Sequence, residues 1–232
     1  MNKQKESELL DLVRQNYENI ADDFDQTRQR KLWPTLAAIA SKTPTGAKVL
    51  DVGCGNGRLR QAWLGRNVEY VGIEPSNNLL FLAKNNASWQ LPGQKLLSGD
   101  IIDLNRLDLG LFDEVFCIAV IHHLPGKDMR RQALRLLLEQ VKPGGRVVIS
   151  AWSMWQAPLF RKLVVKNFLL KLLGLNGLDF GDVVFNGFNQ KCPRYYHAYT
   201  ERGFRKAMII ENAEIEEFIS DKKNYYAVLR KK

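Results

Sequence analysis

The stretch VLDVGCGNGR, residues Val49 to Arg58, decides the fold of this chain. Its first four residues predict a short buried strand that contains Asp51, and Gly53, Gly55 and Gly57 follow in close succession. Glycine permits a tight turn and lets backbone amides approach a ligand without interference from a Cβ atom. We therefore expect a strand, a ligand-binding turn and the start of a helix.

Short apolar runs and helical patterns alternate on both sides of this turn. The apolar runs predict strands at 48–52, 68–73, 95–97, 114–121 and 146–151. Helical spacing of apolar residues predicts helices at 6–20, from Trp33-Pro34 onward, at 77–85 and at 129–141. Such alternation predicts an α/β fold with a mostly parallel sheet and helices on both faces.

The C-terminal third interrupts this alternation. A turn is expected at Pro143-Gly144-Gly145, and residues 159–189 are predicted to form a basic amphipathic helix followed by a loop rich in Gly, Asn and Phe. We expect that helix to pack on the core as a lid, with an anionic membrane surface as the alternative. A helix at 201–212 and strands at 214–220 and 225–229 complete the prediction.

These elements predict one domain over residues 1–232. Its expected parts are an N-terminal helical cover (1–45), a cofactor-binding core (46–152), an insertion or lid (153–200), and a terminal helix with a strand pair (201–232).

Composition narrows the class of protein. Hydrophobic residues make up 45% and charged residues 25%, which is typical of a folded soluble chain and excludes a disordered or fibrous one. The net charge of +9 favours a polyanionic partner such as nucleic acid. Cys54, Cys117 and Cys192 form no CxxC pair, so no metal site is expected. The polar N-terminus and the lack of a long apolar run predict a cytoplasmic protein without a membrane span.

Two acidic residues suggest what binds at the glycine turn. Glu74 closes the second predicted strand, where a carboxylate can bind a ribose diol, and Asp100 follows the third, where it can bind an adenine amino group. NAD is a rival ligand, but its GxGxxG fingerprint would require a third glycine where Arg58 stands. Cys54 is interpreted as a small loop residue rather than a nucleophile.

The ordered motifs VLDVGCGNG, VGIEPS, SGDI, FDEVFCIAV and KPGGRVVIS resemble those of class I S-adenosylmethionine-dependent methyltransferases over residues 48–152. The resemblance implies a Rossmann-like, seven-stranded sheet whose last strand is antiparallel, and S-adenosylmethionine as cofactor. The cofactor-binding residues that it implies are Asp51, Gly53, Cys54, Gly55, Gly57, Glu74, Pro75, Asp100, Ile101 and Ala119. A strand-end acid without a ligand remains the alternative for Asp51.

Segments outside this core are similar to a narrower family, the tRNA wobble-uridine methyltransferases that esterify 5-carboxymethyluridine, including the domain fused to AlkB-type dioxygenases. The similar segments are Tyr17, Ile20-Ala21, Phe24, Thr27-Arg28, Trp33-Pro34, AVIHH at 119–123, Ala151-Trp152, RYYH at 194–197 and Asn224-Tyr225.

This second resemblance implies roles for eight residues. Arg28, His122 and Arg194 are the expected catalytic residues, with a guanidinium orienting the acceptor carboxylate and His122 giving an orienting hydrogen bond. The expected substrate-binding residues are Trp33, His123, Tyr195, Tyr196 and His197. The tyrosines would stack on an extruded base. The implied partner is tRNA, and a small zinc-binding activator subunit is a candidate second partner.

Other interpretations stay open at this point. Paired histidines after this strand recur in class I methyltransferases with many substrates. Arg28 is also typical of a solvated helix end, and Tyr195 and Tyr196 are also typical of core aromatics. Glu74 stands where the family usually has Asp, and the loop VVFNGFNQKCP lacks the Pro-Trp pair of eukaryotic members. A small-molecule methyltransferase of the same fold and a non-catalytic RNA-binding or activator protein are the alternative functions.

Overall fold

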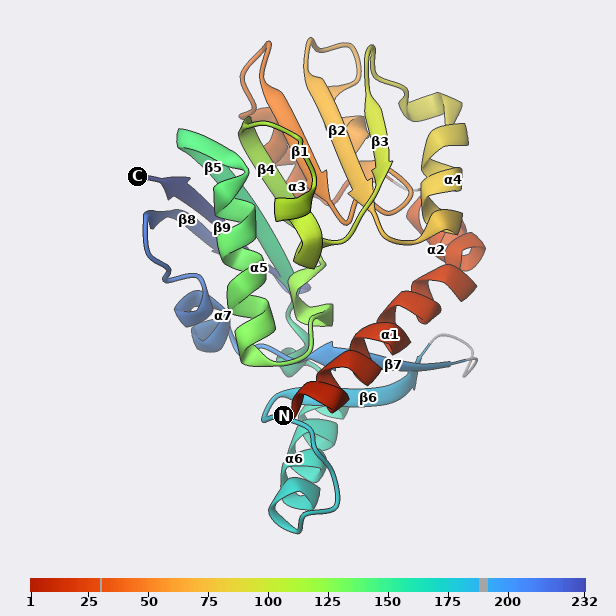
Figure 1. Cartoon of the computed structure of the whole chain (residues 1–232), viewed down its shortest axis with the longest axis vertical. Helices are drawn as coiled ribbons and strands as arrows, with labels where there is room; N and C mark the ends of the chain where they lie inside the picture. The colour runs from red at the N-terminus through yellow and green to blue at the C-terminus, as the bar shows by residue number, and fades with distance from the viewer. Residues whose placement is uncertain (30, 188–191) are drawn as a thin grey trace.

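In the computed structural model, a seven-stranded sheet has the order β3-β2-β1-β4-β5-β9-β8 (Figure 1). The structure describes residues 1–29, 31–187 and 192–232. The strands are β1 (Lys48–Val52), β2 (Glu69–Glu74), β3 (Lys95–Ser98), β4 (Phe112–Ile118), β5 (Val141–Trp152), β8 (Ala213–Ser220) and β9 (Asn224–Lys231). Strands β1 to β5 pair in parallel, and the last strand, β9, runs antiparallel to both β5 and β8. The predicted fold class is confirmed.

The central strands are apolar on both sides because both faces of the sheet are covered. Leu50 and Val115 belong to one buried cluster, which includes residues of α5 (Lys127–Glu139). Their neighbours Val49 and Phe116 belong to a second cluster with residues of α3 (Pro34–Ser41) and α4 (Asn77–Asn85). Successive side chains of a strand point to opposite faces, so each strand feeds two cores.

Helices α1 (Lys3–Asn19) and α2 (Ala21–Arg28) pass by the carboxyl ends of β1, β2 and β3 (Figure 1). Helix α1 starts earlier than the predicted residue 6 because the Asn2 side chain accepts a hydrogen bond from the Lys5 amide (2.8 Å) and caps the helix. Glu18 accepts a hydrogen bond from Ser76 Oγ (2.6 Å), which ties α1 to the start of α4.

The predicted loop within 159–189 is wrong in part, because β6 (Asp182–Gly187) pairs there with β7 (Cys192–His197). The hairpin therefore carries the RYYH segment in β7. Tyr195 packs in a cluster with Leu9 of α1, whereas Tyr196 packs on the opposite side with Val164 of α6 (Pro158–Leu172). In the segment VVFNGFNQKCP, residues 188–191 lie outside the described residues.

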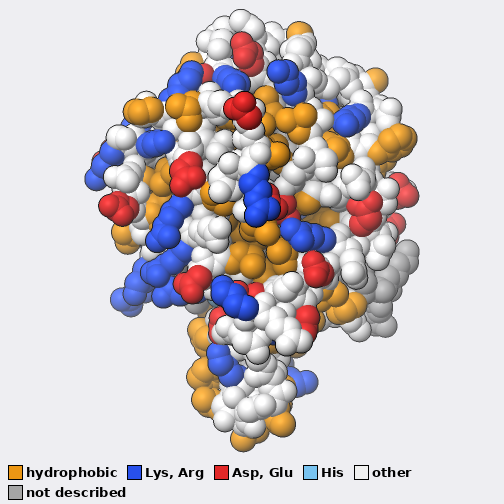
Figure 2. Space-filling view, in the orientation of Figure 1, with side chains coloured by type: hydrophobic (Ala, Val, Ile, Leu, Met, Phe, Trp, Pro, Cys, Tyr) orange, Lys and Arg blue, Asp and Glu red, His pale blue; other side chains and the backbone are white. Residues whose placement is uncertain are grey.

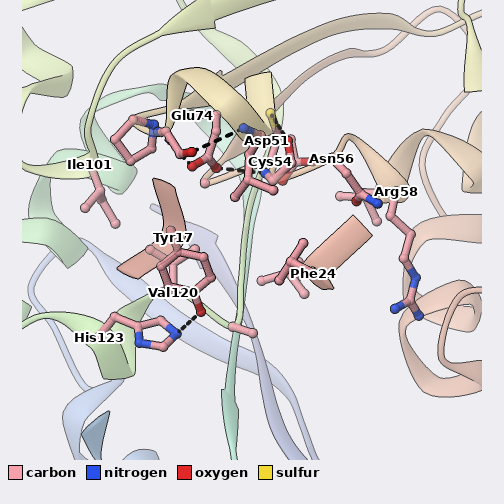
Figure 3. A pocket seen from close by; sticks show the side chains of 18 of the residues that line it. Tyr17, Phe24, Asp51, Cys54, Asn56, Arg58, Glu74, Ile101, Val120 and His123 are labelled. Atoms are coloured by element: carbon pink, nitrogen blue, oxygen red, sulfur yellow. Dashed lines mark hydrogen bonds between the residues drawn. The ribbon is translucent and has the colours of Figure 1, made fainter. Parts of the chain in front are cut away.

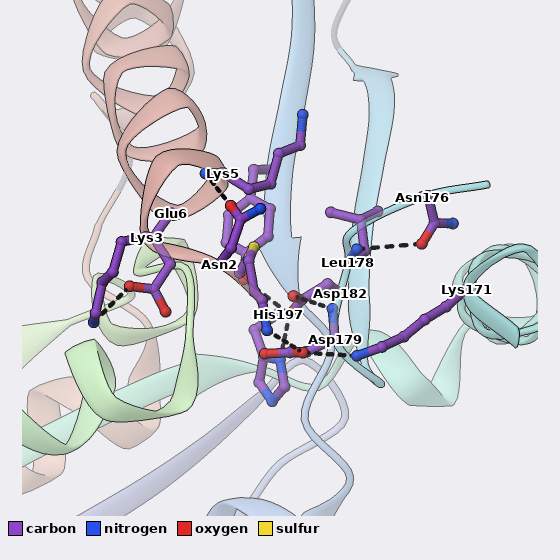
Figure 4. Close-up of polar contacts among 12 residues, drawn as sticks. Asn2, Lys3, Lys5, Glu6, Lys171, Asn176, Leu178, Asp179, Asp182 and His197 are labelled. Carbon is purple, nitrogen blue, oxygen red and sulfur yellow. Dashed lines mark hydrogen bonds and ion pairs between the residues drawn. The ribbon is translucent and has the colours of Figure 1, made fainter. Parts of the chain in front are cut away.

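Buried polar contacts hold the hairpin in place (Figure 4). The Asp182 carboxylate accepts hydrogen bonds from Tyr195 Oη and His197 Nδ1, both 2.8 Å long. The Asp179 amide donates to the same carboxylate (3.0 Å). Without this carboxylate, each of the three donors would be buried with no hydrogen-bond partner in place of water. The fully buried Asp182 therefore holds the insertion together.

Other features of the C-terminal part also differ from the prediction. Helix α7 (Glu201–Ala207) ends before the predicted residue 212. Strand β5 already starts at Val141, which pairs with Phe112, and Pro143-Gly144-Gly145 lies in an irregularity of the strand before the next pair, Glu114 with Arg146. In α6 only Val164 is buried, and this side of the helix packs on the hairpin of β6 and β7.

Short 3-10 helices complete the chain: η1 (Arg58–Trp63), η2 (Ala87–Trp89), η3 (Ile101–Arg106), η4 (Ile121–His123) and η5 (Met154–Gln156). No helix within the described ranges is long and apolar enough to cross a membrane.

Candidate active site

A cavity lies at the carboxyl ends of the parallel strands, between the glycine turn and the first two helices (Figure 3). The sequence-predicted residues that line it are Arg28, Trp33, Asp51, Gly53, Cys54, Gly55, Glu74, Pro75, Asp100, Ile101, Ala119 and His123. This edge of a parallel sheet is where α/β proteins bind ligands.

The glycine turn fits closely around its neighbours. Gly53 has φ of +72°, and a Cβ atom there would lie 2.4 Å from Val120 Cγ2. Gly55 has φ of +56°, and its backbone N–H donates a 2.8 Å hydrogen bond to the Glu74 carboxylate. Gly57 does not line the cavity, and a Cβ atom there would collide with the buried Arg60 guanidinium at 2.4 Å. A glycine is therefore required at position 57 by the packing of the core.

Two buried carboxylates face this turn. Asp51 accepts a hydrogen bond from Tyr70 Oη (2.8 Å), and burial raises the pKa of Asp51 to about 7 against the effect of that bond. Glu74 accepts from the backbone amides of Gly55 and Ser76, and burial likewise raises the pKa of Glu74 to about 7. Negative charge on either carboxylate therefore lacks full compensation from the protein.

Asp100 lies on a third side of the cavity, at the start of η3. Its carboxylate receives Arg14 of α1 at 3.0 Å from Nε and 2.9 Å from a terminal nitrogen. The same side chain accepts from the Ile102 amide (3.4 Å) and so caps η3. Arg14 thus fixes the direction of Asp100 and joins α1 to the cavity wall.

The remaining wall is aromatic and cationic. Tyr17 Oη lies 2.8 Å from His123 Nε2, and burial lowers the pKa of His123 to about 3, so its imidazole is neutral. Arg28 lies with its guanidinium carbon 5.2 Å from the centre of the Phe24 ring. Burial lowers the pKa of Arg28, and the positive charge of Arg194 lowers it further. The two guanidinium groups are therefore close enough to interact electrostatically.

His122 lies away from the cavity. Its ring is fully buried, among the described residues neither ring nitrogen has a hydrogen-bond partner, and the ring stacks on Tyr196 at 5.7 Å between centroids. The cause is local: Ala119 has φ of +58°, and the following turn of η4 directs His123, not His122, toward the cavity.

The RYYH segment is not on the wall of the main cavity. Arg194, Tyr195 and Tyr196 line a small adjoining cavity, which shares Tyr17 and His123 with the main one. His197 is held by Asp182 in the hairpin. Both tyrosines are almost fully buried, so the structure shows them as packed side chains rather than as an open stacking platform.

Several wall residues were not assigned a site role from the sequence: Arg14, Tyr17, Phe24, Asn56, Arg58 and Trp152. Tyr17, Phe24 and Trp152 belong to the segments that carry the family resemblance, and that resemblance could have indicated them. Arg14 had no such signal because it lies on the polar side of a surface helix. Among the described residues, no group of three or more His, Cys, Asp or Glu side chains is placed to hold a metal ion.

The chain is similar to known proteins both in sequence and in fold. Residues 50–147 match the family described as a methyltransferase domain. The fold is also similar to a SAM-dependent methyltransferase structure from Methanosarcina mazei, with a TM-score of 0.69 and 17% identity over 87% of this chain and 99% of that chain. The structural match and the sheet order show a Rossmann-like fold, and residues 50–147 of the chain are similar to methyltransferase domains.

The curated proteins to which the chain is similar have more specific names. The chain is similar to the tRNA (carboxymethyluridine(34)-5-O)-methyltransferase of Arabidopsis thaliana, at 36% identity over 144 residues, which are 61% of this chain and 32% of that protein. The enzyme of the same name from Saccharomyces cerevisiae is 32% identical over 155 residues, 66% of this chain and 51% of that protein. The matched part thus spans about a third to a half of these relatives.

The buried Asp51 carboxylate predicts a pH-dependent stability. Its pKa is about 7 when folded and ordinarily 3.8, so the folded chain holds a proton that the unfolded chain releases between these values. Stability is therefore lost as pH rises through this window. Asp51→Asn should remove about 2–4 kcal/mol of that loss between about pH 4 and pH 8, measured by urea unfolding.

Glu211→Gln, at an exposed position, is the matched control and should leave the pH dependence as in the wild type. The same pH dependence in Asp51→Asn and in the wild type would contradict the assignment of this proton to Asp51.

Proposed function

We propose that this chain uses S-adenosylmethionine to methylate the carboxylate of 5-carboxymethyluridine at the tRNA wobble position. The observation that carries the proposal is that one cavity joins the glycine turn and its three acids to Arg28 and His123. The same cavity therefore offers a site for a cationic nucleoside cofactor and, in Arg28, a positive charge that can bind an anionic acceptor.

The residues present fit S-adenosylmethionine. Without Cβ atoms, Gly53 and Gly55 leave a cradle of backbone at the carboxyl end of β1. Asp51 would hold the cationic methionine end, because the hydrogen bond from Tyr70 and the charge of Arg60 offset only part of the effect of burial on the pKa of its carboxylate. Glu74 would hold the ribose diol, since each of its oxygens keeps a lone pair beyond the backbone hydrogen bond it accepts. Asp100 and Ile101 would hold the adenine.

When bound, the cofactor supplies a methyl group already activated by its sulfonium. A carboxylate acceptor carries no proton at neutral pH, so the protein needs to orient it rather than deprotonate it. Arg28 would bind that carboxylate, with Arg194 adding positive charge from the adjoining cavity. The neutral His123, fixed by Tyr17, takes the orienting hydrogen bond that the sequence analysis assigned to His122.

Transfer RNA as substrate is supported by the names of the curated relatives and by the net charge of +9. Neutralised phosphates release counterions, so binding of tRNA would weaken steeply with salt. The proposal includes a cytoplasmic location, and a small zinc-binding activator as an optional partner.

The decisive experiment incubates the purified chain with labelled S-adenosylmethionine and tRNA that carries 5-carboxymethyluridine. Mass spectrometry of the digested nucleosides should detect labelled 5-methoxycarbonylmethyluridine. If no label appears, the reaction is repeated with a zinc-binding activator. If label is still absent while the cofactor binds, the proposal is wrong and a small-molecule acceptor is favoured.

The assignment of Asp100 and Arg14 makes a prediction about cofactor affinity. Asp100→Ala removes the hydrogen-bond acceptor for the adenine amino group and should weaken binding about tenfold or more, as measured by calorimetry. Arg14→Gln releases Asp100 from its partner on α1 and should weaken binding to a smaller extent. Arg106→Gln, an exposed arginine on the same turn, is the control. Unchanged affinity of Asp100→Ala would refute the adenine assignment.

A second prediction separates orientation of the acceptor from cofactor binding. Arg28→Ala should lower turnover about 10–100-fold while cofactor affinity stays near normal, because the guanidinium would contact the acceptor alone. Arg28→Lys should retain part of the activity, since it keeps the charge but loses the bidentate geometry. Lys31→Ala, a neighbouring exposed cation, is the control. Full activity of Arg28→Ala would remove Arg28 from the site.

A further inference from the structure

Helix α6 projects from the body of the molecule, and its outward side is apolar (Figures 1 and 2). Among the exposed large apolar side chains of this helix and of the residues just beyond its end, the exposed fractions are 51% for Val165, 54% for Leu169, 67% for Leu172, 72% for Leu173 and 70% for Leu175. Val165, Leu169 and Leu172 follow helical spacing and so share one side of the helix. We call these five residues the α6 patch.

The opposite side of α6 is anchored, so the patch is not the result of a loosely placed helix. Val164 is buried at 1% exposure and packs in a cluster with the half-buried Phe160 and Leu163. Asn167 Nδ2 donates to the Asp182 carbonyl oxygen (3.2 Å) and joins the helix to β6. With its inner side fixed, α6 cannot turn its outer leucines inward.

Positive charge surrounds the α6 patch. Arg161, Lys162 and Lys166 are exposed on the same helix, and the sequence has no acidic residue from position 151 to 178. Lys171 differs because it forms an ion pair with Asp179 (2.9 Å). Apolar side chains beside cations that form no ion pair with any described residue complement a surface that is both apolar and anionic.

We propose that the α6 patch is a peripheral docking surface for an anionic lipid bilayer. The projection is convex (Figure 2), and a fluid bilayer closes around a convex apolar end, whereas a protein partner would have to supply a matching groove. RNA would use the cations but would leave the leucines in water. The leucines enter the acyl boundary, and Arg161, Lys162 and Lys166 contact the headgroups. This inference is independent of the proposed function.

The test uses the full chain and sedimentation with vesicles of equal parts phosphatidylcholine and phosphatidylglycerol. The wild type should bind these vesicles at least about tenfold more strongly than vesicles of phosphatidylcholine alone, because each basic residue near an anionic surface contributes favourably. Vesicle binding requires no methyl transfer, so its outcome is distinct from that of the nucleoside assay.

Two variants separate the apolar and the charged contributions. Replacing Leu169, Leu172 and Leu173 together with Gln keeps a good helix former at exposed positions and should weaken vesicle binding at least about tenfold. Lys162→Gln with Lys166→Gln should weaken it by a similar factor and reduce its salt dependence. Circular dichroism checks that both variants fold.

Matched controls place the same changes elsewhere. Gln at Phe81, Leu111 and Ile209, which are exposed at 66%, 47% and 72%, should leave vesicle binding unchanged. Lys222→Gln with Lys223→Gln controls for net charge.

Three outcomes would overturn the proposal. The first is equal binding of the wild type and the triple leucine variant to anionic vesicles, or no binding by either. The second is a wild-type dimer in light scattering that the leucine variant dissociates, without vesicle binding, which would make the patch a contact between copies. The third is loss of tRNA affinity in the lysine variant without any vesicle binding.

Discussion

The hydrogen bonds between the Glu74 carboxylate and the amides of Gly55 and Ser76 are the contact on which this molecule depends. They join the turn after β1 to the end of β2 and to the start of α4. A buried carboxylate needs such partners, and the glycine turn needs an acceptor for an amide that points inward. A substitution of Glu74, or one that moves the Gly55 amide, would disturb the ends of β1 and β2 at once. The floor of the cavity is therefore set by one side chain, and burial raises the pKa of that same side chain to about 7, which leaves it receptive to donors from a ligand.

The first two helices attach to this floor through polar contacts, one to each successive strand end. Asp25 of α2 accepts from Asn56 Nδ2 after β1 (2.7 Å), Glu18 of α1 accepts from Ser76 after β2, and Arg14 binds Asp100 after β3. Polar contacts of this kind contribute little each when they are partly exposed, and α1 is also held by the buried side chains of Leu9 and Leu10. A ligand that binds Asp100 adds to the same set of contacts.

The parts of the site that could be predicted from sequence are those fixed by strand ends. Asp51, Glu74 and Asp100 each stand at or after a parallel strand, and parallel strands bring their carboxyl ends to one edge, so their convergence follows from the pattern alone. The choice between His122 and His123 could not be predicted, because it depends on the left-handed backbone at Ala119, a conformation that alanine rarely adopts. The hairpin was missed for a different reason. Its strands carry Gly and Asn, which predict a loop, and only the contacts of Tyr195 with α1 and of Tyr196 with α6 make the pairing stable.

The position of α6 in the chain explains why its leucines stay exposed. The helix follows β5, but the buried clusters on the two faces of the sheet contain residues of α3, α4, α5 and α7 and none of α6. It packs instead on one side of a two-stranded hairpin whose other side is taken by α1. A narrow hairpin buries only a narrow stripe of helix, here centred on Val164. If α6 served only to cover the hairpin, polar residues would be expected on the rest of its surface, as on the exposed faces of most helices. The leucines and lysines found there instead point to a second environment, apolar and anionic, that this part of the molecule meets.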